Sequence, residues 1–212
     1  KLLFGTAGAP LSSKPPTTEG GIKRITELGL GCMEVQFVRG VKMSESMARM
    51  VAEVAKKRGV KLTAHAPYFI NLNAREEEKV IASQERLIQT ARIASLLGAE
   101  GIVFHAAFYL DAPPSAVYAK VKRNLEQTIR QLRAEGNQVL LRPETMGKGS
   151  QFGTLEEVLS LSAEVEGVAP CIDFAHWHAR TGRFNTYEEF AAMLQQVEGR
   201  LGRKALDNVH IH

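Results

Sequence analysis

Two histidines in the sequence each follow directly on an apolar run: His65 ends the stretch KLTAH, and His105 ends the stretch GIVFH. Later apolar runs end on carboxylates or on a further histidine, at Glu144, Asp173 and His210. Imidazole and carboxylate groups together suit borderline divalent metals such as zinc and manganese. One such histidine is more often an ordinary polar residue near a loop, but five such groups on five successive runs indicate a common metal site.

The stretch CIDFAHWHARTG (171–182) contains a second spacing with chemical meaning, because Asp173 and His176 are three residues apart. Where a strand gives way to a turn, this spacing can direct both side chains at neighbouring metals. His178 is the alternative to His176, since it follows only two residues later.

The elements that must position these residues follow a simple alternation. Short apolar runs recur at intervals of about 30 to 40 residues, with helix-length segments between them. The runs are 1–5, 32–37, 61–65, 101–105, 138–144, 169–173 and 206–212. Strands that are apolar without alternation, separated by helices, are typical of a parallel α/β sheet.

The segments between the runs have the spacing of helices. Segments 46–59 and 84–101 repeat apolar residues every three or four positions, and Gly59 supplies a C-terminal stop for the first. The segment 154–167 begins with Thr154 and has Glu157 three residues later, which is the pattern of a capping box.

The positions of the polar residues favour one architecture for this sheet. Strand ends scattered over the whole sequence converge in space only if the strands close into a ring. A TIM (β/α)8 barrel places its chemistry at the rim formed by the C-terminal strand ends. The chain offers seven strands and six intervening helices, and it starts without methionine. We therefore expect a single TIM-barrel domain over residues 1–212, lacking the last helix of unit seven and all of unit eight.

Composition excludes several classes of protein. Apolar residues make up 44% and charged residues 24% of the chain, and no apolar run is long enough to span a membrane. Without a secretory pattern, we expect an intracellular, cytoplasmic protein with no membrane partner. Cys32 and Cys171 lie among apolar residues, as buried thiols do, although a disulfide between them stays open. The net charge of +4 permits a polyanionic partner without requiring one.

Four stretches together resemble the endonuclease IV family of apurinic/apyrimidinic endonucleases. They are HAPYFINLNA (65–74), FHAAFY (104–109), PETMGKGSQFGTLEEV (143–158) and CIDFAHWHARTG (171–182). The family adopts a TIM barrel of the xylose-isomerase-like superfamily. The chain departs from the family pattern in two places. Ala106 and Ala107 replace the usual Pro-Gly after the strand-four histidine, and Pro143 and Thr145 flank Glu144 in place of Leu and Asn.

The resemblance implies a zinc cluster centred on Glu144. His65, His105 and Glu144 are similar to the ligands of the family's first zinc. Glu144 would also bridge to a second zinc, completed by Asp173 and by a histidine of the seventh strand. That histidine is expected to be His210, with His212 as the rival on the same face of the strand.

A third zinc is implied by His176, so the complete site would contain up to three zinc ions. The family takes the other two protein ligands of this third metal, and a glutamate for the second, from beyond the seventh strand. None of those three is present in this chain, so a site with one or two metals would follow.

The implied activity is that of a hydrolase in base excision repair. Such a zinc-dependent phosphodiesterase is a DNA repair endonuclease that cleaves double-stranded DNA 5′ to an abasic site and leaves a 3′-hydroxyl. Zinc lowers the pKa of bound water to about 7, so the attacking group would be a metal-bound hydroxide. Glu144 would then be catalytic through the metals that it binds. The sequence favours a monomer without fixing the oligomeric state.

Three residues are expected to contact DNA. In the family, the positions that match Tyr68 and Phe69 insert into the duplex and fill the gap left by the displaced abasic nucleotide. For Phe69, packing of the loop against the barrel top is an equally good interpretation. Arg39, in EVQFVRG, is either a phosphate contact or an ordinary surface arginine.

Other functions stay open. A sugar isomerase or epimerase of the same superfamily would bind one Mn, Mg or Co through Glu144, Asp173 and His210, but it gives no role to the pair His65 and His105. A DNA-binding or scaffold protein with a decayed site is a third possibility. For Glu144, the structural alternative is a salt bridge to Arg142 or Lys148.

Overall fold

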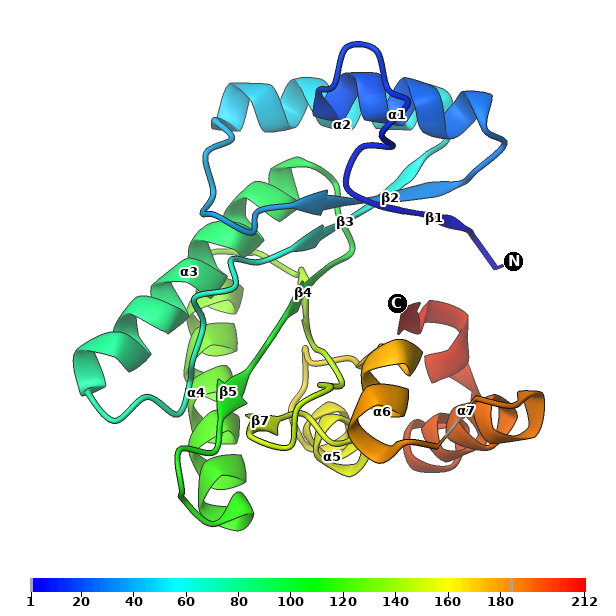
Figure 1. The fold of residues 1–212 in the computed structure, drawn as a ribbon. Coiled ribbons are helices and arrows are strands. Elements are labelled where there is room, and N and C mark those ends of the chain that lie inside the picture. Colours follow the sequence, from blue (N-terminus) through cyan, green and yellow to red (C-terminus); the bar gives the residue numbers. More distant parts are fainter. Residues whose placement is uncertain (1, 184) are drawn as a thin grey trace.

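The computed structural model describes residues 2–183 and 185–212. Its centre is a parallel sheet in the order β1-β2-β3-β4-β6 (Figure 1). The strands of this sheet are β1 (Gly5–Ala7), β2 (Cys32–Gln36), β3 (Lys61–His65), β4 (Gly101–Phe104) and β6 (Leu140–Pro143). The parallel α/β arrangement predicted from the apolar runs is therefore confirmed.

The strand order continues beyond β6. Parallel bridges from Leu141 to Val168 and from Glu144 to Cys171 join β6 to the chain around β8 (Cys171–Ile172). β8 pairs in turn with β9 (His210–Ile211), also in parallel. Strands that follow one another in space in their sequence order, all in the same direction, are the arrangement of a TIM barrel.

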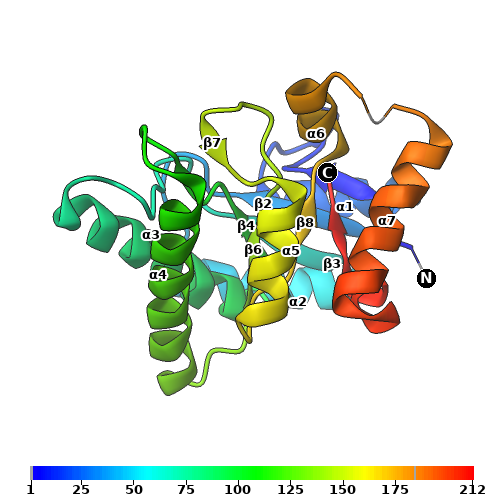
Figure 2. The same cartoon turned by 90° about the horizontal axis from the view of Figure 1, so that it is seen from below.

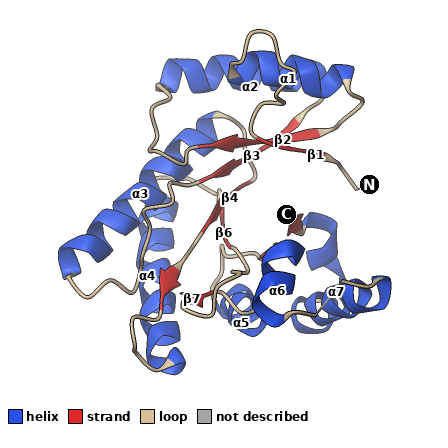
Figure 3. Cartoon of the chain, viewed as in Figure 1, coloured by secondary structure: helices blue, strands red, loops and turns tan. Residues whose placement is uncertain are grey.

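Helices cover the outer side of these strands (Figures 1 and 2). They are α1 (Thr18–Glu27), α2 (Glu45–Arg58), α3 (Glu77–Leu96), α4 (Pro114–Ala134), α5 (Leu155–Glu164) and α7 (Tyr187–Leu201). A further helix, α6 (Phe174–Thr181), begins at the C-terminal end of β8 instead. Figure 3 shows helices and strands alternating along the chain. Between β8 and β9 the chain forms α6, α7 and a 3-10 helix. None of the described helices combines the length and the apolar character that a membrane crossing needs.

The first strand lies later in the chain than predicted. It was expected at residues 1–5 but forms at Gly5–Ala7, because β2 begins at Cys32 and the register pairs Gly5 with Cys32. The close approach of these strands requires the glycine, since a Cβ atom on Gly5 would lie 2.0 Å from the carbonyl oxygen of Cys32. Lys1 lies outside the described residues. The apolar residues that suggested the earlier start are exposed: Leu2, Leu3 and Phe4.

The last strand is shorter than predicted. Within the expected range 206–212, the residues up to Asn208 belong to a 3-10 helix, η1 (Arg203–Asn208), and only His210–Ile211 form β9. Two short strands were not predicted: β5 (Ala107–Phe108) and β7 (Gln151–Phe152), which pair in antiparallel fashion in the loops after β4 and β6. These loops pair because the buried side chain of Phe152 packs against Tyr109.

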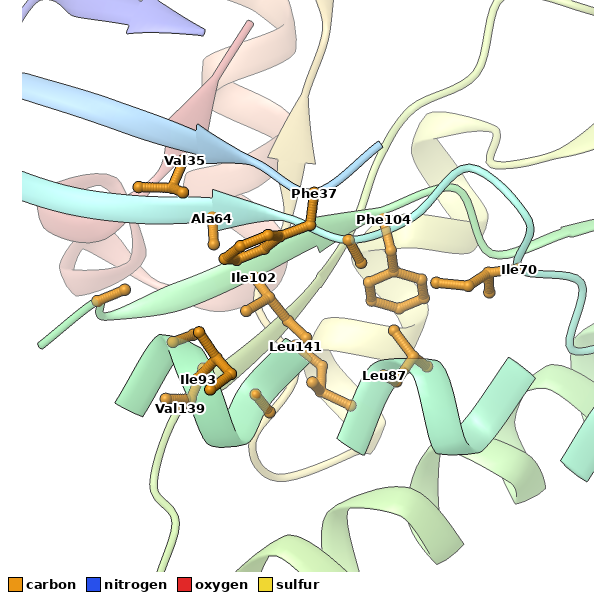
Figure 4. Packing of buried hydrophobic residues seen from close by; sticks show 14 of the residues in the cluster. Val35, Phe37, Ala64, Ile70, Leu87, Ile93, Ile102, Phe104, Val139 and Leu141 are labelled. Atoms are coloured by element: carbon orange, nitrogen blue, oxygen red, sulfur yellow. The ribbon is translucent and has the colours of Figure 1, made fainter. Parts of the chain in front are cut away.

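The strands present alternate residues to the helices. Val35, Ala64, Ile102 and Leu141 belong to the apolar core, and Figure 4 shows the strand side chains packed against Leu87 and Ile93 of α3. Because strand side chains alternate between two faces, the residues next to them face the inner side of the sheet. The inner positions include Glu34, His65 and Arg142.

Arg142 is a buried charge that positions the last strands. Its Nη1 donates to the carbonyl oxygen of Pro170 at 3.2 Å, and its Nη2 donates to Oδ1 of Asn208 at 2.9 Å. Arg142 therefore fixes the chain just before β8 and the end of η1, from which β9 begins. With its donors directed there, the salt bridge considered between Arg142 and Glu144 does not form.

The capping box at the start of α5 is confirmed and gives a stability prediction. The Thr154 hydroxyl accepts from the Glu157 amide at 3.2 Å, and the Glu157 carboxylate accepts from the Thr154 amide at 2.9 Å. We predict that Thr154→Ala lowers the free energy of unfolding in urea by about 1 kcal/mol. The control is Thr26→Ala, whose hydroxyl bonds only within α1 and should change that free energy by less than about 0.5 kcal/mol. Equal effects of the two substitutions would contradict this interpretation.

Candidate metal centre

Glu144 is the centre of a buried cluster of histidines. Its carboxylate, which is 2% exposed, follows β6 at the inner face of the sheet. The Nε2 atoms of His65 and His105 lie 3.4 and 3.1 Å from its Oε2 atom. The Nδ1 atoms of His176 and His212 lie 3.4 and 3.0 Å from its Oε1 atom. Both carboxylate oxygens are therefore surrounded by ring nitrogens from distant parts of the chain.

Neighbouring strand ends bring the first of these residues together. His65 is the last residue of β3, and it pairs with Val103 of β4. His105 follows β4 directly, and the Glu144 amide donates to the Phe104 carbonyl at 3.1 Å. The three side chains thus meet at the C-terminal edge of adjacent strands, which is where a barrel places its chemistry.

The hydrogen bond of His65 shows what this group is suited to bind. His65 Nδ1 lies 2.8 Å from the Ala66 carbonyl oxygen, which can only accept, so the proton is on Nδ1. In the neutral ring, Nε2 then has no proton and directs a lone pair at Glu144 Oε2. Both atoms are hydrogen-bond acceptors, so neither satisfies the other. Among the described residues, that oxygen is buried without a hydrogen bond of good geometry. A cation between these atoms would satisfy both.

The candidate ligand set is compact and charged. One ligand atom from each of His65, His105 and Glu144 lies within 4.8 Å of the others. Burial alone would raise the pKa of Glu144, but the histidine rings around its two oxygens outweigh burial and keep its pKa far below the usual range. Glu144 is therefore ionised at neutral pH and available to a divalent metal.

Asp173 and His176 lie beside this cluster, with a helix start where the sequence suggested a turn. Asp173 is the N-cap of α6, and its Oδ1 accepts from the His176 amide at 2.6 Å. Its Oδ2 lies 3.4 Å from His176 Nδ1, and burial raises the pKa of this carboxyl group. Asp173 also forms a compact group of possible ligands with Glu144 and His212. His178 is exposed, and its Nδ1 bonds the Arg183 carbonyl instead, so it lies outside the cluster.

His210 in β9 and His212 just after it share one neighbour, Glu34, but only His212 also reaches Glu144. His212, not His210, contacts Glu144, while the Nε2 atom of His210 lies 3.2 Å from Oε2 of Glu34. His212 Nε2 lies 3.0 Å from the same oxygen. Burial alone would raise the pKa of Glu34, but hydrogen bonds with His210 and His212 lower it to about 2. The sequence expectation that His210 reaches Glu144 is thus not what the contacts show, and the ligand choice between the two stays a proposal.

Glu34 is a residue of the site that the sequence analysis missed. It lies in the middle of β2, between Met33 and Val35, and is 5% exposed. A glutamate inside an otherwise apolar run is itself a signal, because an ionised carboxylate is seldom buried without a partner.

The expected DNA-contacting residues lie at the mouth of the cluster. The Tyr68 ring, 51% exposed, stacks on His105 with ring centroids 5.1 Å apart and an interplanar angle of 7°. Phe69 is 62% exposed, and only its carbonyl is bonded, by Arg86 at 3.1 Å. Arg39 is exposed in the turn after β2, next to Val38, whose carbonyl accepts from the Tyr68 amide at 3.4 Å. The structure therefore brings all three to one rim.

Comparison with known proteins identifies similar chains. The model of a family described as a xylose isomerase-like TIM barrel matches residues 22–212. An uncharacterized protein of Methanocaldococcus jannaschii is 42% identical over 212 residues, which cover 100% of this chain and 76% of that protein. A probable endonuclease 4 of a Geobacillus strain is 29% identical over 74% of this chain. One from Mycoplasma pneumoniae is 27% identical over 71% of it. The matches span about half of these two proteins, 53% and 52%.

Solved structures agree on the fold. Endonuclease IV from Thermus thermophilus matches with a TM-score of 0.73 and 23% identity, covering 98% of this chain and 74% of that one. A D-psicose 3-epimerase matches with a TM-score of 0.73 and 15% identity, covering 92% of this chain and 70% of that one. The TIM-barrel fold class is thereby confirmed, and these two structures share it although they act on different substrates.

The geometry of the first ligand group predicts metal content. We expect that the chain purified without chelator contains divalent metal, and that His65→Ala and His105→Ala each lose about one metal ion per chain. Elemental analysis by mass spectrometry gives the count, and circular dichroism checks the fold of each variant. His178→Ala, outside the cluster, is the control and should keep all of its metal. Unchanged metal in both cluster variants would rule out this pair as ligands.

Proposed function

The chain belongs to the family of xylose isomerase-like TIM barrels, and from this premise we propose that it is a zinc-dependent DNA repair endonuclease that hydrolyses the phosphodiester 5′ to abasic sites. The observation that supports the proposal most is the buried group of His65, His105 and Glu144 at the strand ends, with exposed aromatic residues beside it. The similarity to proteins named probable endonuclease 4 supports the same substrate class.

The ligand types favour zinc over harder metals. Two imidazoles with one carboxylate are a usual zinc set, whereas magnesium and calcium prefer oxygen ligands alone. When bound, such ions lower the pKa of water and neutralise charge on a phosphoryl group. His65 is oriented for this task by its bond to the Ala66 carbonyl, because that bond leaves Nε2 as the ligand atom. Glu144 presents one oxygen to this group and the other to Asp173 and His212.

Tyr68 and Phe69 supply the proposed contact with damaged DNA. Tyr68 is fixed by its stacking on His105, so its ring is presented beside the metal ligands. Phe69 leaves most of its side chain in solvent, as an aromatic wedge does before it enters a duplex. A wedge replaces the stacking that the duplex loses where a base is missing. Arg39, exposed in the adjacent turn, is placed to contact a flanking phosphate.

A second candidate function is supported by one observation. Glu144, Asp173 and His212 form their own compact group, which suits the single metal of a sugar isomerase or epimerase. A sugar isomerase or epimerase with this single metal would not use His65 and His105, although both lie close to Glu144. The two are separated by offering the metal-loaded chain an abasic-site duplex, an undamaged duplex and a set of ketoses. Cleavage of the abasic duplex to a 3′-hydroxyl end supports the nuclease, and conversion of a ketose without cleavage supports the epimerase.

The role of Glu144 gives a direct test. Glu144→Gln keeps the shape of the side chain but removes the negative charge shared by the surrounding ligands. We predict that abasic-site cleavage falls by at least about a thousandfold, on the scale of a lost electrostatic stabiliser. The melting temperature of the metal-free protein should change little. Glu164→Gln, an exposed residue paired with Lys122, is the matched control and should cleave normally. Near-normal cleavage by Glu144→Gln would refute the mechanism.

The wedge proposal is tested by removing one ring. Because stacking on an aromatic side chain contributes about 1–3 kcal/mol, we predict that Phe69→Ala lowers kcat/KM for abasic duplex by about tenfold or more. Its metal content and melting temperature should stay those of the parent. Phe4→Ala removes a similarly exposed ring near the start of the chain, 65 residues before Phe69, and should leave kcat/KM unchanged. A lower melting temperature with unchanged kcat/KM would instead assign Phe69 to loop packing.

A further inference from the structure

A second group of ligand atoms lies beside the first on the inner face of the sheet. Glu34 Oε2 lies 3.2 Å from His210 Nε2 and 3.0 Å from His212 Nε2. The two ring nitrogens are themselves 3.2 Å apart. The three atoms form a nearly equilateral triangle, contributed by β2 and by the end of the chain around β9.

The sides of this triangle, 3.0 to 3.2 Å, are slightly shorter than the spacing of ligands around a bound metal. Ligands at roughly 2.0–2.2 Å from a tetrahedral zinc lie roughly 3.3–3.5 Å from one another. Hydrogen bonds alone serve the triangle poorly. If the Nε2 atoms of His210 and His212 both carry a proton and donate to Glu34, the two N–H groups point at each other at 3.2 Å. If one Nε2 atom accepts from the other instead, Glu34 receives only one hydrogen bond. A cation at the centre satisfies all three atoms at once.

The other nitrogen of His212 supports the same arrangement. Its Nδ1 lies 3.0 Å from Oε1 of Glu144, so it can donate a hydrogen bond to that carboxylate. Histidines that bind metal through one nitrogen usually donate the other N–H to a carboxylate or carbonyl. A neutral His212 ring offers only one nitrogen to a metal. Binding through Nε2 beside Glu34 therefore excludes binding through Nδ1 with Asp173.

Cys171 adds a soft donor to the surroundings. It pairs with His210 in the register of β8 and β9, and its Sγ atom lies within 4.8 Å of ligand atoms of His210 and His212. Two imidazoles and one carboxylate with a cysteine sulfur nearby favour zinc over magnesium at this position, because magnesium prefers oxygen ligands alone.

We propose that Glu34, His210 and His212 form a metal-binding position of their own, distinct from the position of His65, His105 and Glu144. Zinc is the expected ion. The two positions are linked through the His212 ring, whose Nε2 faces Glu34 and whose Nδ1 bonds Glu144. This proposal does not depend on cleavage of abasic DNA, but it excludes the single-metal group of Glu144, Asp173 and His212.

The test measures zinc in the full chain. The protein is stripped with chelator, reloaded with zinc, and titrated against a zinc-binding dye to give stoichiometry and affinity. We expect Glu34→Gln to lose one zinc, with affinity at that position weakened by at least about a hundredfold, because even outer partners of a ligand contribute 10–100-fold. The zinc of His65 and His105 should remain. Glu100→Gln, which removes an exposed glutamate paired with Lys61, is the matched control and should keep every zinc.

Two further variants separate this position from its neighbours. Asp173→Asn should keep the zinc that Glu34→Gln loses, and Glu34→Gln combined with His105→Ala should lose two. Full zinc content in Glu34→Gln, or the same loss in Asp173→Asn, would overturn the proposal. Loss in His105→Ala but not in Glu34→Gln would leave the nuclease proposal standing and refute this one.

A measurement on the unmodified chain covers the case in which Glu34→Gln fails to fold. Anomalous scattering at the zinc edge, from crystals grown with saturating zinc, should show a peak within about 2.2 Å of the Glu34 carboxylate and of both Nε2 atoms. A map with zinc at His65 and His105 but none beside Glu34 would refute the proposal.

Discussion

The constraint on which this structure depends is the burial of an ionised carboxylate. Glu144 is 2% exposed, and removing a charge from water costs several kcal/mol unless partners replace the solvent. The partners are the four histidines around its two oxygens, which come from β3, the residue after β4, α6 and the end of the chain after β9. The order and direction of the strands follow this requirement, since only parallel neighbours bring their C-terminal ends to one place.

The same alternation that builds the core makes the inner face polar. Val35 and Ala64 pack under the helices, so Glu34 and His65 must face inward. Each inward polar residue then needs a partner of its own, as Arg142 finds in Pro170 and Asn208. The apolar layer between strands and helices fixes the strand positions, and the polar interior uses those positions to assemble ligand groups.

Local sequence predicted one part of this arrangement, and long-range packing decided the rest. His65, His105 and Glu144 were found because a polar residue after an apolar run depends only on its own segment. Glu34 was not, because its partners lie in the last residues of the chain: it is 178 residues from His212. His210 and His212 share one face of a strand, so only the register of β9 against β8 decides which ring reaches Glu144. The strand ends at Gly5 and after Asn208 also depend on pairing partners rather than on apolar runs.

Glu34 contacts His210 and His212, and these contacts connect elements that no backbone hydrogen bond joins within residues 2–183 and 185–212. Within residues 2–183 and 185–212, β1 and β9 are the outer strands of the order and do not pair with each other. Side chains on the inner face connect β2 to β9 instead, through Glu34, His210 and His212. A metal bound there would stabilise the folded chain by its binding free energy, because the unfolded chain offers no such site. A metal held by Glu34, His210 and His212 would hold β2 and β9 at a fixed distance, and the positions of these two strands would in turn hold the ligands in place.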